Sequence, residues 1–272
     1  MSAAQWKEKG KSMPKVGLIT GSGFYEEGMG IRELKKITTP YGEPSDVFRV
    51  GELPEGEFVL ISRHGTPHHI PPHMINYRAN IWGMREMGVE RVISINAVGG
   101  IEGDLVPGDI VIPDQVIDMT HGRAATFYEN DEVVHIDFTT PYCAEMREAI
   151  KEAGIESHVG LRDSGTYVCV NGPRLESRAE IQHLLKIGGD IVGMTVMPEA
   201  CLARELELCY AGIAVVTNYA AGISGRRLTT KEVMETMKGS LERIKKLVIG
   251  AFKHIPEKRN CECSYALKDS TI

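Results

Sequence analysis

Two polar runs in the C-terminal half of the chain carry a carboxylate and an amide that could recognise a planar heterocycle. Glu176 lies in the run NGPRLESRAE, and Asn218 and Ala220 lie in the run VVTNYAAG. An ionised Glu176 can only accept a hydrogen bond, whereas the Asn218 amide can both donate and accept. If both runs line a purine pocket, the pair suits a base with an N1–H and a carbonyl at C6, and it suits adenine poorly.

Four segments that follow predicted strands could hold an oxyanion such as phosphate. The GSG segment with Ser22 offers backbone N–H groups and a hydroxyl, and Arg63, followed by His64, offers a planar fork. Ala97 precedes two glycines and could supply an amide, and Thr195 could supply a hydroxyl. A plain turn or a surface arginine explains each segment alone. Because ligands gather at the carboxyl ends of strands in α/β folds, the recurrence favours a phosphate site.

Other ligand classes are disfavoured by the motifs. No Gly-Lys-Ser/Thr follows the GSG segment, and Glu26 stands where the dinucleotide fingerprint needs its third glycine. His68, His69 and His73 suggest a metal, but the prolines at 71–72 break any helix that would place the imidazoles on one face. We therefore expect neither a metal nor an organic cofactor.

The elements that must position these residues alternate between strands and helices. This alternation predicts an α/β fold, in which helices flank a central mixed sheet. Serines and threonines followed three residues later by glutamate mark two helix starts, near residues 177 and 229. We expect strands over residues 16–20, 47–50, 58–62, 91–97, 109–117, 165–170, 191–194 and 212–217, and helices over residues 76–87, 141–153, 177–187, 198–209 and 229–251.

Length and composition indicate one soluble domain. The chain has 272 residues, 42% of them hydrophobic, and a formal net charge of −6. Neither nucleic acid nor a membrane is an expected partner, because there is no basic excess and no apolar run of about 18 residues. We expect a cytoplasmic protein with an extension at 1–13, a domain at 14–255 and a loose or partner-binding polar tail at 256–272.

The cysteine spacing matches no zinc motif. Four of the six cysteines lie in apolar contexts that are typical of buried free thiols. The other two form a CxC pair, which could close a strained disulfide or stay reduced. The four are Cys143, Cys169, Cys201 and Cys209, and the pair is Cys261 and Cys263.

In the order and spacing of its motifs the chain resembles the trimeric-type purine nucleoside phosphorylases, in the branch that includes methylthioadenosine and methylthioinosine phosphorylases. The resemblance spans residues 14–255. It implies cleavage of the bond between ribose C1′ and purine N9 by inorganic phosphate, which is a co-substrate, with no cofactor. The motifs are TGSG (20–23), SRHGTPHHIPPHMINYRANIWG (62–83), NAVGG (96–100), NGPRLESRAE (171–180), GMTVMPEACLARE (193–205) and TNYAAG (217–222).

The resemblance also implies a role for each matching residue. The phosphate group would be bound by Ser22, Arg63, His64, the Ala97 amide and Thr195. The nucleoside would be bound by Met194, Glu176, Asn218, Ala220, His135, Thr230 and Met234, with His135 reaching the site of a neighbouring subunit. The expected catalytic residues are Asn218, Glu176 and His64.

The same comparison bears on the base and on the assembly. In methylthioadenosine phosphorylases the position matching Glu176 is typically serine, and the segment matching residues 218–220 typically carries two aspartates. This chain has Asn218 and Ala220 there. We therefore expect a 6-oxopurine nucleoside, namely methylthioinosine, inosine or guanosine, with methylthioadenosine as the alternative. The resemblance implies a homotrimer or a dimer of trimers with a shared active site.

A protein that binds a nucleoside without cleaving it is the alternative from another class. A nucleosidase, which uses water instead of phosphate, is disfavoured by Arg63 and Thr195.

Overall fold

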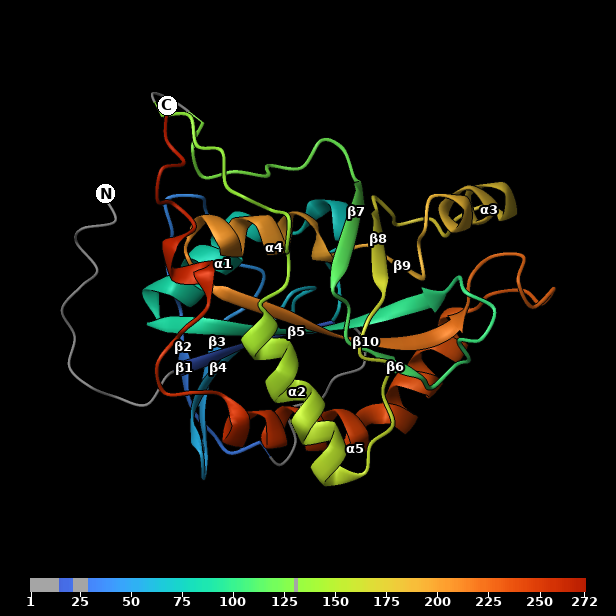
Figure 1. Ribbon diagram of the computed structural model, residues 1–272, viewed down its shortest axis with the longest axis horizontal. Coiled ribbons are helices and arrows are strands. Elements are labelled where there is room, and N and C mark those ends of the chain that lie inside the picture. The colour runs from blue at the N-terminus through green and yellow to red at the C-terminus, as the bar shows by residue number, and fades with distance from the viewer. Residues whose placement is uncertain (1–14, 22–28, 130–131) are drawn as a thin grey trace.

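The computed structural model describes residues 15–21, 29–129 and 132–272. Its strands form one mixed sheet in the order β2-β3-β4-β1-β5-β9-β8-β7, with β10 beside β5 and the short β6 beside β10 (Figure 1). The predicted α/β class with a central mixed sheet is confirmed. The strands are β1 (Lys15–Thr20), β2 (Ile31–Lys35), β3 (Phe48–Leu53), β4 (Gly56–Ser62), β5 (Val89–Gly100), β6 (Ile110–Val111), β7 (Gln115–Met119), β8 (Thr166–Val170), β9 (Ile191–Gly193) and β10 (Cys209–Tyr219).

The centre of the sheet is parallel, and this is where the expected site residues meet. β1 pairs in parallel with β4 and β5, and β5 pairs in parallel with β10. These strands are buried on both faces, which explains their continuous runs of Val, Ile and Leu. Their carboxyl ends therefore open at one edge of the sheet.

Helices cover both faces of this parallel centre. α1 and α4 pack together on one side, and α2 and α5 pack together on the other (Figure 1). Local capping sets several helix starts: Asn76 accepts the Ala79 N–H, and Ser177 forms the predicted capping box with Glu180. The helices are α1 (Tyr77–Glu86), α2 (Ala144–Ser157), α3 (Arg178–Lys186), α4 (Val196–Glu205) and α5 (Thr230–His254), with short 3₁₀ turns η2 (Pro72–Met74) and η3 (Glu262–Tyr265).

Several predicted boundaries are wrong. The expected strand at 109–117 is divided into β6 and β7, because Pro113 cannot continue the ladder. The helix expected at 198–209 ends at Glu205, and Cys209 already begins β10. β2 was not expected, since only its two end residues are even partly buried and the apolar signal is weak.

The C-terminal tail is not loose. The Arg91 guanidinium donates to the Pro256 carbonyl over 2.7 Å, which fixes the point where the tail leaves α5. Farther along, the Ser270 carbonyl accepts the His135 N–H over 2.8 Å, and the Ile272 N–H reaches the Val133 carbonyl over 3.1 Å. The tail therefore binds back onto its own chain, including the segment that carries His135.

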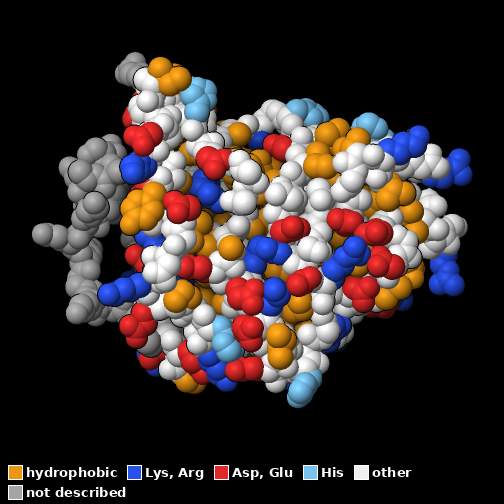
Figure 2. All heavy atoms as spheres, viewed as in Figure 1, with side chains coloured by type: hydrophobic (Ala, Val, Ile, Leu, Met, Phe, Trp, Pro, Cys, Tyr) orange, Lys and Arg blue, Asp and Glu red, His pale blue; other side chains and the backbone are white. Residues whose placement is uncertain are grey.

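One face of the molecule carries charged side chains of both signs. On the side shown in Figure 2, acidic and basic side chains are interspersed over the helices. Among the described residues, no helix is both long enough and apolar enough to cross a membrane.

Candidate active site

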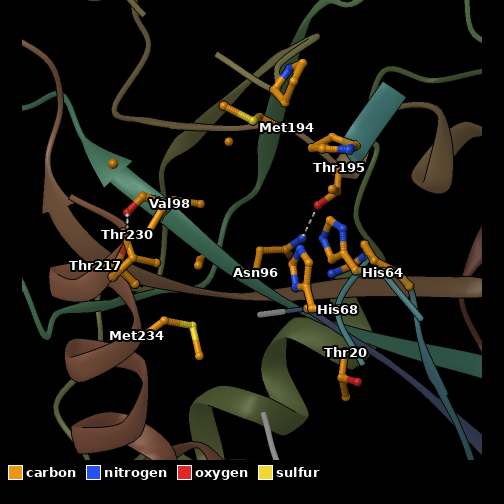
Figure 3. Close-up of a pocket in the computed structure, with 18 of the residues that line it drawn as sticks. Thr20, His64, His68, Asn96, Val98, Met194, Thr195, Thr217, Thr230 and Met234 are labelled. Carbon is orange, nitrogen blue, oxygen red and sulfur yellow. Dashed lines mark hydrogen bonds between the residues drawn. The ribbon is translucent and has the colours of Figure 1, made fainter. Parts of the chain in front are cut away.

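A cavity of about 770 Å³ opens where the parallel strands end. Thr20 ends β1 and Gly21 follows it, Arg63 follows β4, and the ends of β5 and β10 also line the cavity. Figure 3 shows Met234 and Thr230 of α5 on one side and His64 and His68 on the other. The predicted site residues that line it are Arg63, His64, Ala97, Glu176, Met194, Thr195, Asn218, Thr230 and Met234.

A bulge near the end of β10 brings two consecutive side chains into the cavity. Val216 pairs with Val98 and Asn218 with Gly99, so Thr217 is an extra residue in the ladder. Successive strand residues normally point to opposite faces, and a bulge re-aims one of them. As a result both Thr217 and Asn218 line the cavity.

The orientation of the Asn218 amide is set by its neighbours. Its Nδ2 donates to the Tyr219 carbonyl over 2.9 Å, and the Thr217 hydroxyl lies 3.0 Å from its Oδ1. Because a carbonyl can only accept, the atom that faces Tyr219 must be the NH₂ group. One N–H of Asn218 then remains available for a ligand.

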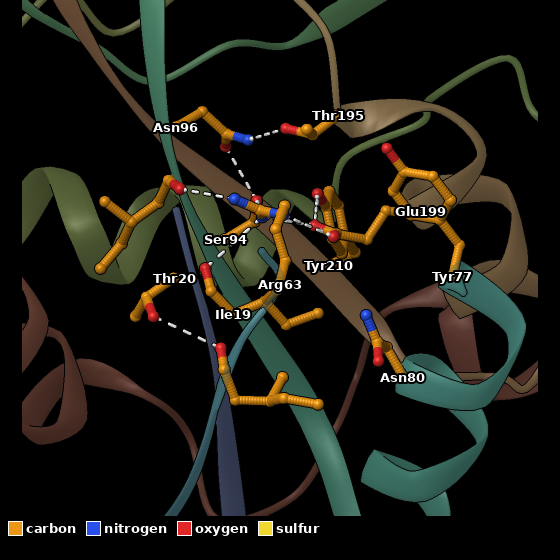
Figure 4. A network of polar contacts seen from close by, with 12 residues as sticks. Ile19, Thr20, Arg63, Tyr77, Asn80, Ser94, Asn96, Thr195, Glu199 and Tyr210 are labelled. Atoms are coloured by element: carbon orange, nitrogen blue, oxygen red, sulfur yellow. Dashed lines mark hydrogen bonds and ion pairs between the residues drawn. The ribbon is translucent and has the colours of Figure 1, made fainter. Parts of the chain in front are cut away.

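Arg63 is held by Glu199 beneath the cavity (Figure 4). Its Nε and Nη2 donate to the two Glu199 carboxylate oxygens over 3.0 and 2.8 Å, and the Tyr210 hydroxyl donates to the same carboxylate over 2.8 Å. Both charged side chains are only 1% exposed. Burial alone would lower the pKa of Arg63, but Glu199 raises it above its ordinary value, so the guanidinium is charged.

The fork of Arg63 therefore chelates Glu199 and cannot also chelate phosphate, so this part of the prediction is wrong. Of the five N–H groups of an arginine, one on Nη1 donates to the Ile95 carbonyl over 2.9 Å, and Nη2 also donates to the Ser94 hydroxyl over 2.9 Å. One Nη1 N–H has no acceptor among the described residues. The Nη1 atom lies close to Gly21, where an added Cβ would be 3.0 Å from it.

A hydrogen-bonded chain runs from Arg63 to the cavity wall (Figure 4). The Ser94 hydroxyl accepts from Arg63 and donates to Asn96 Oδ1 over 2.8 Å. The Asn96 NH₂ then donates to the Thr195 hydroxyl oxygen over 3.1 Å. With its oxygen accepting from Asn96, Thr195 retains its own O–H to donate to an anion.

His64 is a neutral imidazole. Its Nδ1 lies 2.8 Å from the Ile70 carbonyl, which requires the proton to be on Nδ1. Burial, reinforced by the charge of Arg63, lowers the pKa of His64 to about 3. Its Nε2 is therefore an acceptor, and its ring stacks on His68 with centroids 4.2 Å apart.

Glu176 and Met194 come together through the loop after β8. Gly172 has a φ of +61 degrees, and a Cβ there would lie too close to the Met194 sulfur, so the position requires glycine. Burial raises the pKa of Glu176, and the nearby Glu180 raises it further. Glu176 is thus a half-buried carboxyl group that lines the same cavity as Asn218.

Two predicted site residues do not line the cavity, and a third cannot be placed. Ala220 is 1% exposed and packs in the core with Ile101 and Val192 behind the site, so it is not a contact residue. His135 lies on the segment bound by the C-terminal tail, and its contribution to a neighbour's site stays a prediction. Ser22 lies outside the described residues.

Sequence reasoning missed the residues that orient the anion-binding groups. Ser94 and Asn96 are polar at alternate positions of the otherwise apolar run 92–98, and that pattern marks one face of β5. Glu199 was quoted only within a motif, and no local signal pairs it with Arg63, which is 136 positions away. The sequence also did not predict that four cysteine sulfurs cluster away from the cavity, because their spacing matches no zinc motif.

Comparison with known proteins gives concordant matches over nearly the whole chain. A model of the phosphorylase superfamily matches residues 15–253. The chain is 49% identical over 263 residues to a probable S-methyl-5'-thioinosine phosphorylase of Thermodesulfovibrio yellowstonii, covering 96% of this chain and 99% of that protein. It is 48% identical over 266 residues to the 6-oxopurine nucleoside phosphorylase of Pyrococcus furiosus, covering 95% and 100%.

A solved structure shares the fold. The methylthioadenosine phosphorylase of Schistosoma mansoni in complex with adenine superposes with a TM-score of 0.89 at 32% identity, covering 94% of this chain and 96% of that one.

Proposed function

This chain belongs to the phosphorylase superfamily, and we propose that it cleaves a 6-oxopurine nucleoside with inorganic phosphate to give a free purine and a ribose 1-phosphate. S-methyl-5'-thioinosine, inosine and guanosine are the substrates that fit the proposal. The reaction forms a bond from a phosphate oxygen to C1′ and breaks the bond from C1′ to N9, whose electron pair leaves with the purine.

The observation that carries the choice of base is Glu176 in the same cavity as Asn218. As a carboxylate, Glu176 accepts the N1–H of hypoxanthine or guanine. Against adenine it would place an acceptor beside the unprotonated N1, unless it took up a proton. Mismatched polar groups of this kind discriminate between substrates by orders of magnitude. The methylthioadenosine alternative is supported by the fold match to the Schistosoma mansoni enzyme, but not by this residue.

Asn218 is proposed to stabilise the leaving purine. Its remaining Nδ2 N–H would donate to N7, where negative charge grows as the bond to C1′ breaks. A donor already oriented in a site that excludes water is worth about 3–4 kcal/mol in the transition state. Met194 would lie against the ribose between this donor and the phosphate.

The phosphate would bind at the other end, among the polar groups that follow the strand ends. The free Nη1 N–H of Arg63, the Thr195 hydroxyl and the Ala97 amide would donate to it. Neutral His64 would accept from a protonated phosphate oxygen at Nε2. These groups position phosphate and balance its charge, and the proposed mechanism needs neither a metal nor an organic cofactor.

The 5′ substituent would face Thr230 and Met234, which stand on α5 at the exposed rim of the cavity. We also propose a homotrimer or a dimer of trimers, in which His135 of one subunit completes the 5′ side of its neighbour's site.

Phosphate dependence tests the reaction class directly. We expect release of hypoxanthine from inosine or methylthioinosine only when phosphate is present, with ribose 1-phosphate or its methylthio analogue as the second product. Release of base in phosphate-free buffer would indicate a nucleosidase. Binding of nucleoside without release of base in either buffer would indicate a binding protein.

A further inference from the structure

Four cysteine side chains that the proposed reaction does not use converge outside the cavity. The Sγ atoms of Cys143, Cys209, Cys261 and Cys263 all lie within 4.8 Å of one another. Cys143 is the N-cap of α2, Cys209 begins β10, and the other two lie at the start of η3 in the tail. Three separate parts of the chain thus contribute sulfur atoms to one point.

We propose that these four cysteines form a structural site for one tetrahedrally coordinated divalent metal ion, Zn²⁺. Closed four-cysteine sets are a common form of structural zinc site. Zn–S bonds of about 2.3 Å place the four sulfurs about 3.8 Å apart along the edges of a tetrahedron. The Cys209 and Cys261 sulfurs are already 3.4 Å apart, which is close to that edge and is reached by a small adjustment.

The surroundings favour a closed site. Cys143, Cys209 and Cys263 are each no more than 3% exposed and belong to the apolar core beneath the sheet. Four thiolates around Zn²⁺ carry two net negative charges, and Arg204, 7% exposed, acts electrostatically on Cys263. The cysteine at the N-cap also receives the positive end of the α2 dipole.

The backbone around the cluster is fixed by other contacts. The Cys143 N–H donates to the Tyr210 carbonyl over 2.8 Å, which holds the α2 cap against the start of β10. The Asn260 N–H donates to Glu145 over 2.9 Å, and this seats the tail just before Cys261. The two halves of the site are therefore oriented by the fold, and binding of the metal adds a direct link between them.

Such a link would fasten the tail at its midpoint. Beyond η3, Ser270 accepts the His135 N–H and Thr271 bridges Val134. The metal would thus stabilise the part of the tail that binds the segment carrying His135. The inference does not rest on the proposed reaction, since no cluster residue lines the cavity.

The test is the metal content of the full-length protein purified under reducing conditions. We expect about one zinc per chain by mass spectrometry of the metal, loss of that zinc in Cys261→Ser and Cys263→Ser, and retention in the control Cys201→Ser. Cys201 is a cysteine outside the cluster whose sulfur faces the Pro198 carbonyl at 3.1 Å, a contact that a hydroxyl can make. Co²⁺ reconstitution of the metal-free wild-type protein should produce the visible absorption bands of tetrahedral cobalt thiolate.

Two results would overturn the proposal. One is wild-type protein that takes up less than stoichiometric zinc even after reconstitution under reductant, although all six cysteines of the unfolded chain react as free thiols. The other is recovery of two disulfides among these cysteines from protein that is prepared without reductant and alkylated directly on cell lysis. Circular dichroism of each variant is recorded first, so that a variant that fails to fold is recognised before its metal content is measured. For folded variants, metal content and the fall in Tm on adding a chelator are then compared with those of the wild-type protein.

Discussion

Replacing Glu176 with glutamine tests the base recognition at the atom that the proposal invokes. Glutamine keeps the shape of the side chain and one acceptor oxygen, but it removes the charge and adds an NH₂ donor. The variant can therefore accept the N1–H of hypoxanthine or, after rotation of the amide, donate to N1 of adenine. We expect the ratio of kcat/KM for inosine to that for adenosine to fall.

The size of this change follows from two effects. A hydrogen bond to a charged group is worth about 1 kcal/mol more than a neutral one, so cleavage of inosine slows. For adenosine, the variant no longer places a carboxylate acceptor against the acceptor N1 of adenine. Removing this mismatch stabilises the transition state for adenosine by about 1–3 kcal/mol. Together they predict a ratio lower by about 30- to 700-fold.

Glu180→Gln is the matched control. Glu180 is four positions away, accepts the Ser177 N–H at the cap of α3 and pairs with Arg174 outside the cavity. Its loss should lower stability slightly and leave the substrate ratio unchanged. An unchanged ratio in Glu176→Gln, or an equal fall in Glu180→Gln, would refute the assignment of Glu176 to the base.

Three further predictions concern the buried pair, pH and the 5′ side. Glu199→Gln leaves the Arg63 charge uncompensated, which costs about 3–5 kcal/mol and should lower Tm by about 6–20 °C in thermal unfolding. Glu205→Gln is its control on the same helix, because Glu205 accepts the Phe127 N–H and forms no ion pair within the described residues. An equal Tm for both variants would contradict the account. Burial raises the pKa of Glu176 above 4.5, so kcat/KM for inosine should fall as pH is lowered towards that pKa. The kcat/KM for adenosine should not fall in parallel, and parallel pH profiles would count against the role of Glu176 in base recognition. Met234→Ala should raise KM for methylthioinosine about fivefold and leave that for inosine nearly unchanged, and a common shift would remove Met234 from the 5′ side.

Locally encoded features of the fold were predictable from the sequence. The strands before the GSG segment and before Arg63, and the capped start of α3 at Ser177, follow from apolar runs and capping residues within a few positions. The lengths of β5 and β10 were underestimated. Gly99 and Gly100 suggested a turn, yet both continue the strand in close packing against Val192 and Val216.

Features that depend on distant parts of the chain were not predictable. The position of Arg63 was correct, but its partner Glu199 turns the guanidinium fork away from the cavity. The cysteine cluster escaped notice for the same reason, because Cys143 and Cys209 meet the CxC pair only through packing of α2, β10 and the tail. In both cases the sequence shows which residue types are present, but the tertiary fold determines which of them come into contact.

The most direct test of the central claim is phosphate-dependent turnover of matched 6-oxo and 6-amino nucleosides by the wild-type protein. Inosine is compared with adenosine, and methylthioinosine with methylthioadenosine, at saturating phosphate. The account predicts that each 6-oxo substrate is cleaved at least about 10-fold faster in kcat/KM than its 6-amino partner. Equal values within both pairs, or faster cleavage of the 6-amino member, would contradict it.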